Sequence, residues 1–233
     1  KNILSVGHFR TLIIFMNWLA KDYCIPSLRR FVMPIREIAV SNFKSFRDLQ
    51  FSPDNFNIII GSNASGKSNL IQVFKFIRDI AKYGLNNAIS LQGGVEYLRN
   101  TIIGPAMPFA FRIVYVLEEK RADVIGVKDG LPVYFEPYEI KYEFALTFPD
   151  SGESYEISID LLTVSGNFCH SGASGIHQLG AGTLTLSRVD GSVAYCVCPP
   201  GGLELKDLDL FPQYFQKRQI PLKWLIMNLP ISV

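Results

Sequence analysis

Residues 61–68, GSNASGKS, place two glycines, a lysine and a serine at the spacing G-x-x-x-x-G-K-[S/T]. Glycines at these positions let successive backbone N–H groups turn toward one anion, and the positive end of a following helix adds to the same field. Lys67 can reach the β- and γ-phosphates of a nucleotide as a point charge, and Ser68 can offer its hydroxyl to the Mg²⁺ that bridges them. The spacing therefore predicts a phosphate-binding loop, with Lys67 as the catalytic cation and Ser68 as the metal ligand.

A loop of this kind needs a strand before it and a helix after it, and the sequence predicts both. Residues 56–60, FNIII, form a continuous apolar run that is typical of a strand buried on both faces. Apolar residues then recur at helical spacing from Leu70 to Ala81, and Gly84 marks the end of the predicted helix. The alternative is a glycine-rich turn with an exposed lysine, and the flanking pattern favours the phosphate-binding loop.

Residues 35–40 and 49–51 are predicted as two short strands, with a turn in the segment NFKSFRD, residues 42–48. This segment, followed by FNIIIGSNASGKSNLIQVFKFI, resembles the amino end of the ATP-binding head shared by RecF, SMC and OLD-type proteins. It is particularly similar to the AAA-labelled ATPases related to OLD. The close resemblance covers residues 35–83, and a looser one continues beyond them.

The resemblance implies ATP and Mg²⁺ as ligands. The residues that it assigns to the nucleotide site are Lys44, Ser45, Gly61, Ser62, Asn63, Ala64, Ser65, Gly66, Lys67, Ser68 and Asn69. For Lys44 and Ser45 the alternative is a solvated turn between two strands, because turns favour such residues. In such heads turnover is thought to follow head-to-head dimerisation, so a homodimer is expected. The implied further partners are DNA or an effector nuclease, in DNA repair or anti-phage defence.

The chain changes character after Gly84. Alternating apolar and polar residues in five later segments predict an antiparallel meander: PFAFRIVYVLEE, YEIKYEFALTF, SYEISIDLLTV, GTLTLSRV and SVAYCVC. Asp190 and Gly191 predict a tight hairpin between the last two, and residues 92–100 predict a loop with a short helix. The expected fold is an α/β P-loop NTPase core, like the amino-terminal half of an ABC-type head, with an antiparallel β-lobe. The expected divisions are an extension at 1–32, a core at 33–103 and the lobe at 104–233.

Hydrolysis also needs carboxylates that hold Mg²⁺ and orient water, and no apolar strand ending in Asp-Glu is evident. Asp160, Asp207 and Asp209 are expected at solvated strand edges or turns. Residues 164–166 and 171–175 contain small residues without a following helical pattern, so they are expected as loops and not as a signature helix. We therefore expect this chain to bind nucleotide without turning it over by itself. The alternative function is a nucleotide-gated binding module with little or no hydrolysis.

Composition and cysteine spacing limit the classes of protein and of site that fit this sequence. The chain has 233 residues, 48% of them hydrophobic, and a net charge of +2, which suits a globular protein and gives no argument for nucleic acid binding. Its cysteines, Cys24, Cys169, Cys196 and Cys198, lack the paired spacing of a zinc site or the density of a disulfide scaffold, so they are expected to be reduced and the protein cytoplasmic. Cys196 and Cys198 should share one face of a strand.

Two further patterns have ordinary explanations. Cys169, His170 and His177 could be metal ligands, but no fourth ligand is suggested by the spacing, and a loop and strand without metal is favoured. Residues 12–20, LIIFMNWLA, are apolar but fall short of the roughly 20 residues that a membrane-spanning helix requires. No stable membrane insertion is expected.

Overall fold

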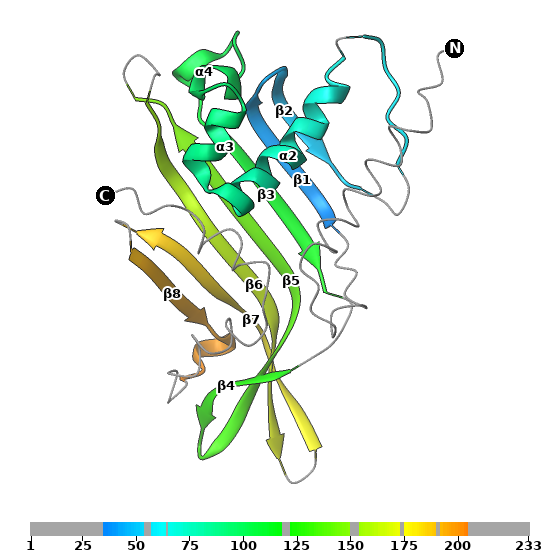
Figure 1. The fold of residues 1–233 in the computed structure, drawn as a ribbon. Coiled ribbons are helices and arrows are strands. Elements are labelled where there is room, and N and C mark those ends of the chain that lie inside the picture. The colour runs from blue at the N-terminus through cyan, green and yellow to red at the C-terminus, as the bar shows by residue number, and fades with distance from the viewer. Residues whose placement is uncertain are drawn as a thin grey trace.

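The computed structural model describes residues 35–53, 57–63, 65–117, 122–149, 154–172, 175–189 and 192–204. These residues form one antiparallel sheet with helices on one of its faces (Figure 1). The strand order is β2-β1-β3-β5-β6-β7-β8, and β4 pairs with β5 off this path. The predicted extension at 1–32 and residues Asp207 and Asp209 lie outside the described residues.

The sheet contains strands from both sides of the predicted boundary at residues 103 and 104. β1 (Ile35–Phe43) and β2 (Phe46–Phe51) form a hairpin, and β1 also pairs with β3 (Phe109–Val116). In that second ladder Val40 lies opposite Phe111. The predicted core and the predicted lobe therefore share one hydrogen-bonded sheet, and the division of the chain into domains stays a prediction.

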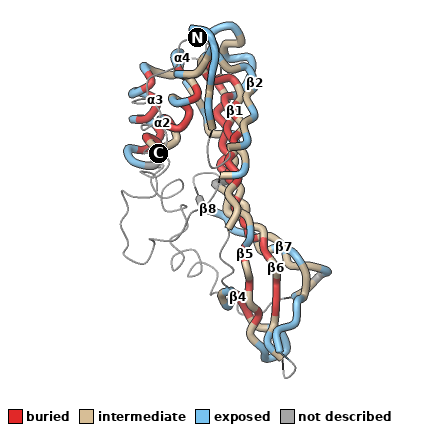
Figure 2. The backbone as a smooth tube through the Cα atoms, turned by 90° about the vertical axis from the view of Figure 1, so that its right-hand side faces the viewer, coloured by how far each residue is buried: buried red, intermediate tan, exposed pale blue. Residues whose placement is uncertain are grey.

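Three helices lie between β2 and β3 in the chain and pack on one face of the sheet (Figures 1 and 2). They are α2 (Lys67–Tyr83), α3 (Leu85–Leu91) and α4 (Val95–Leu98), followed by the short helix η2 (Gly104–Ala106). Apolar residues of α2 and the sheet interdigitate, and the ring of Phe76 lies 6.2 Å from that of Phe43 and 5.5 Å from that of Phe109. All three rings are buried, so this contact anchors α2 to β1 and β3.

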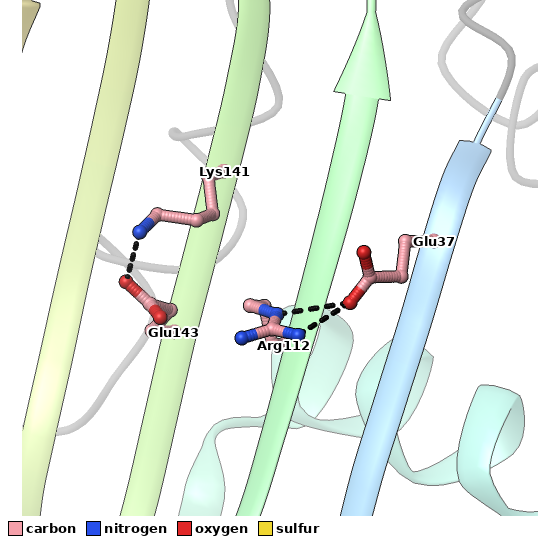
Figure 3. Close-up of polar contacts among 4 residues, drawn as sticks. All are labelled: Glu37, Arg112, Lys141 and Glu143. Atoms are coloured by element: carbon pink, nitrogen blue, oxygen red, sulfur yellow. Dashed lines mark hydrogen bonds and ion pairs between the residues drawn. The ribbon is translucent and has the colours of Figure 1, made fainter. Parts of the chain in front are cut away.

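The opposite face of the same strands is polar. Arg112, which alternates with the buried Phe111 and Ile113, donates from Nε and Nη2 to Glu37 Oε1 at 3.1 and 2.5 Å (Figure 3). Lys141 and Glu143 pair at 2.8 Å on the neighbouring strand (Figure 3). These half-exposed ion pairs contribute little stability each, and the alternation of polar with buried apolar residues determines which face of the sheet meets the helices.

The remaining strands extend beyond the helices (Figure 1). They are β4 (Asp123–Lys128), β5 (Leu131–Thr147), β6 (Glu156–Gly172), β7 (Gly175–Val189) and β8 (Ser192–Cys198), with η3 (Pro200–Gly202) after them. Buried residues reappear near β4 (Figure 2), where the rings of Phe135 and Phe168 pack edge to face at 5.0 Å. Val189 lies opposite Ser192, which confirms the predicted hairpin between β7 and β8. The antiparallel meander is confirmed, whereas β4 was not predicted.

The predicted buried strand at residues 56–60 is wrong for the residues that the structure describes. Residues 57–60 are not a strand, and Ile58 and Ile60 are 60% and 86% exposed. A strand is stable only when its backbone groups are paired. No described strand pairs with these residues, so their β-branched composition alone does not make them a strand.

The predicted loop at residues 164–166 is also wrong, because these residues lie inside β6, as do Ser171 and Gly172 at its end. Gly166 is there because of a close approach and not because of a turn. A Cβ at Gly166 would lie 2.6 Å from Phe135 Cε2 and 2.7 Å from the backbone oxygen of Glu136. Small residues in this strand therefore make room for β5 and its aromatic side chain.

Asp160 was predicted at a solvated edge, and the structure contradicts this. Asp160 is 4% exposed in β6, where its Oδ1 accepts a hydrogen bond from Tyr142 Oη at 2.8 Å. The alternating pattern of β6 places Asp160 on the same face as Leu162 and Val164, which are buried. Its carboxylate is thus part of the core, where hydrogen bonding offsets the cost of burying a polar group.

Candidate nucleotide-binding site

The 61–68 loop leads directly into α2, and two of its glycines have conformational reasons to be there. Gly66 is the N-cap of α2 with φ 89° and ψ 1°, a left-handed conformation that favours glycine. A Cβ at Gly61 would lie 2.5 Å from Ser65 Oγ, so the two sides of the loop approach closely there. The helix itself starts at Lys67 and ends before Gly84, whose N–H donates to Ile80 O at 2.9 Å.

Lys67 folds back across the loop. Its Nζ donates to the backbone oxygens of Gly61 and Ser62 at 2.7 and 2.5 Å, and it lies 3.3 Å from Ser65 Oγ. An ammonium group has three donors, so these contacts use all of them. An anion that entered the loop could replace the carbonyl oxygens as the partner of Lys67, and it would form a stronger, charge-assisted bond.

The charge distribution along α2 suits an anion at its start. Its first turn contains no acidic residue, and its last turn contains Lys82. The positive end of the helix dipole therefore faces the loop without a local carboxylate to neutralise it. Ser68 is exposed in the first turn, as are Ser62, Asn63 and Ser65 in the loop, and Ala64 lies outside the described residues.

The turn formed by Lys44 and Ser45 lies against the start of α2. Asn69 Nδ2 donates to Ser45 Oγ at 2.6 Å. A Cβ added to Gly66 would meet Ser45 Oγ at 3.1 Å and the ring of Phe46 at 3.0 Å, so the turn packs on the last glycine of the loop. The structure thus brings Ser45 and Asn69 into contact, although 24 residues separate them in the chain.

Lys44 is held by the last two residues of α4. Its backbone N–H donates to Leu98 O at 3.0 Å and its Nζ donates to Tyr97 O at 3.2 Å. Partial burial lowers the pKa of the Lys44 ammonium from its ordinary value, and the nearby charge of Lys75 lowers it further. An anion beside this turn would favour the charged form of Lys44.

The comparison with known proteins agrees with this arrangement. The family model of the AAA ATPase domain matches residues 33–145. This part of the chain is thus similar to the AAA ATPase domain. The matched residues include β1 to β4, the three helices, the loop and the turn described above, and most of β5.

A curated relative matches a shorter stretch. The chain is 34% identical over 58 residues to the endonuclease GajA of Bacillus cereus (strain VD045). This match covers 24% of the chain and 10% of the endonuclease. The chain therefore matches a small part of that protein.

Asn42 was not predicted as a site residue, although it is fully buried and bonded to the segment after α4. The available signal was an asparagine at the start of a predicted turn, because asparagine tolerates a left-handed backbone. In the structure Asn42 has this conformation, with φ 50°. Its partners, however, lie about 60 residues further along the chain, and no local pattern identifies them.

The other candidate ligands lie elsewhere. His170 and His177 face each other across β6 and β7 with their rings stacked at 5.2 Å, and Cys196 Sγ lies 3.6 Å from Cys198 Sγ on β8, which confirms their shared face. Within the described residues, no group of three or more His, Cys, Asp or Glu side chains could hold a metal ion. None of the described helices is long and apolar enough to cross a membrane.

Proposed function

We propose that this chain binds ATP with Mg²⁺ through the 61–68 loop and the turn at Lys44 and Ser45, as the nucleotide-binding part of an OLD-, RecF- or SMC-like ATPase head. The observation that carries the proposal is the position of Lys67 Nζ, which lies over the loop at the positive end of a 17-residue helix. The match of residues 33–145 to the AAA ATPase domain supports it.

The residues present fit a nucleotide. Gly61 and Gly66 allow the loop to close around a phosphate, Lys67 supplies a cation, and the N–H groups at the start of α2 supply donors. The exposed Ser68 hydroxyl would hold Mg²⁺, an ion that shields the charge on the β- and γ-phosphates when it is bound. Asn69, Lys44 and Ser45 would border the same phosphates.

Complete turnover in this proposal requires two heads, each finishing the other's site. The alternative is a nucleotide-gated binding module, and the burial of Asp160 favours it for this part of the chain. Asp160 bonds to Tyr142 inside the core, so it is enclosed away from water. We expect the 233-residue chain to bind ATP without measurable hydrolysis, and phosphate release by this chain that Lys67→Ala abolishes would contradict that expectation.

The proposed setting is the cytoplasm, which suits the free thiols of Cys169, Cys196 and Cys198. Proposed partners are a second copy of the head and DNA or an effector nuclease, in DNA repair or anti-phage defence. The printed name of the relative, an endonuclease, supports this choice of partner.

A titration of ATP against the wild type and Lys67→Ala tests the proposal. Removing the ammonium should weaken ATP binding by roughly two orders of magnitude, because a hydrogen bond from a charged group to phosphate is lost. Lys82→Ala is the matched control, since it removes the same charge from the other end of α2. Equal affinity in the wild type and Lys67→Ala would refute the assignment.

A further inference from the structure

We propose that Asn42 is a positioning residue, which holds the Lys44 and Ser45 turn in place beside the phosphates of the nucleotide. The inference rests on the proposed ATP site and adds to it a residue that does not touch the ligand. It is based on the hydrogen bonds that Asn42 makes in the core, and on what those bonds fix at each end of the turn.

Asn42 uses its side chain fully as a donor and also as an acceptor. Its Nδ2 donates to Met107 O at 2.5 Å and to Gly104 O at 3.1 Å, and its Oδ1 accepts from Asn100 N at 3.0 Å. An amide nitrogen has two donors, so each finds a carbonyl. Asn42 is 0% exposed, and at such depth a lost partner leaves a buried polar group without water to replace it.

The segment that Asn42 binds is itself closed by hydrogen bonds. Asn100 Oδ1 accepts from the N–H groups of Ile102 and Ile103 at 2.9 and 3.2 Å, and Gly104 N donates to Asn100 O at 2.8 Å. Residues 100–107 therefore present a fixed set of backbone groups to Asn42 and not a loose loop.

The same part of the chain holds the turn two residues further on. Lys44 N donates to Leu98 O, and Lys44 Nζ donates to Tyr97 O. Asn42 and Lys44 both have left-handed backbones, with φ of 50° and 49°. For Asn42 this conformation is tolerated because its short polar side chain can hydrogen-bond nearby, whereas for lysine it is uncommon. The hydrogen bonds of Asn42 and Lys44, on either side of Phe43, thus maintain the conformation of the turn.

On its other side the turn meets the loop, through Ser45 Oγ against Asn69 and Gly66. The turn is consequently held between residues 97–107 and the start of α2. Without the Asn42 side chain, the turn would keep its contact with α2 and the bonds of Lys44 to α4, but it would lose three hydrogen bonds to residues 100–107. Lys44 and Ser45 would then sample positions away from the phosphates, although no residue in contact with the ligand had changed.

A double-mutant cycle tests this role in the whole chain, with Mg²⁺ and ATP as the probe. Asn42→Gly removes the side chain and keeps the left-handed backbone. It should weaken ATP binding about tenfold, which is the effect of losing roughly one hydrogen bond to a charged group. In a background that already carries Lys44→Ala and Ser45→Ala, it should weaken binding less than about twofold, since the side chains that it positions are gone.

Val133→Ala is the stability control, because Val133 is fully buried opposite Gly126 of β4, a strand that lies away from the helices (Figure 1). The change should lower stability without altering ATP affinity. If Asn42→Gly does not fold, Asn42→Asp takes its place, since it keeps the Oδ1 acceptor and loses both donors. An equal loss of affinity in both backgrounds, or no loss in the first, would overturn the role of Asn42. The proposed ATP site would fail separately, through equal binding by the wild type and Lys67→Ala.

Discussion

Gly66→Ala should both destabilise the chain and weaken ATP binding, and the structure allows the two causes to be separated. The new methyl group would sit on a left-handed backbone, which costs a non-glycine residue about 1–2 kcal/mol. Alanine restricts the unfolded chain, and this offsets the cost by up to about 1 kcal/mol. The methyl group would also meet Phe46 Cε1 at 3.0 Å and Ser45 Oγ at 3.1 Å, and such overpacking adds about 1–3 kcal/mol.

Gly130→Ala is the matched control, because Gly130 has φ 79° but nothing within 4 Å of an added Cβ. Urea unfolding should give a loss of about 1 kcal/mol for Gly130→Ala and about 2–4 kcal/mol for Gly66→Ala, from the same backbone and overpacking terms. Only Gly66→Ala should weaken ATP binding in a parallel titration. If the two variants lose equal stability, the packing of the turn on Gly66 is not what requires glycine there, and the reasoning is refuted.

Three further outcomes are expected. Ser68→Ala should weaken ATP binding more with Mg²⁺ than with a chelator, because its hydroxyl is the proposed metal ligand, and an identical loss in both would exclude that role. Tyr142→Phe should lower the free energy of unfolding by about 1–3 kcal/mol in urea titrations, since Asp160 loses a hydrogen bond in the core, and unchanged stability would contradict this. The hydrogen bond and charge of Cys198 and slight burial raise the pKa of the Cys196 thiol. Its alkylation should therefore need higher pH than that of a free cysteine, and Cys198→Ala should move the rate profile to lower pH, whereas an unmoved profile would show that Cys198 has no such effect.

The sequence predicted the elements whose determinants are local. Helix α2 ends at Tyr83, just before Gly84, as its periodicity and the glycine indicated, and it begins within the residues of the motif. Val189 and Ser192, which flank the predicted turn, likewise pair as the predicted hairpin requires. Both depend on residues within one or two turns of each other, so a pattern along the chain is enough to identify them.

The errors concern residues whose state depends on distant neighbours. Residues 57–60 have the composition of a strand, but a strand forms only when it pairs with another. The residue types of a segment do not show whether such a partner strand exists. Asp160 was expected at a solvated edge because it is charged, whereas Tyr142 on the adjacent strand gives it a partner in the core. Asn42 was missed for the same reason, since its three partners become adjacent only when β1 pairs with β3.

The pairing of β1 with β3 also sets an order of assembly for the molecule. β5 to β8 follow one another along the chain, so each strand can pair with the next one after a short connection. Asn42 and Gly104 are 62 residues apart, and closing such a loop costs roughly 3–4 kcal/mol of chain entropy before any contact offsets it. The helices and the 61–68 loop lie inside that loop. The meander should thus form first, and the nucleotide site should gain its final geometry only when the last long-range closure joins β1 to the sheet.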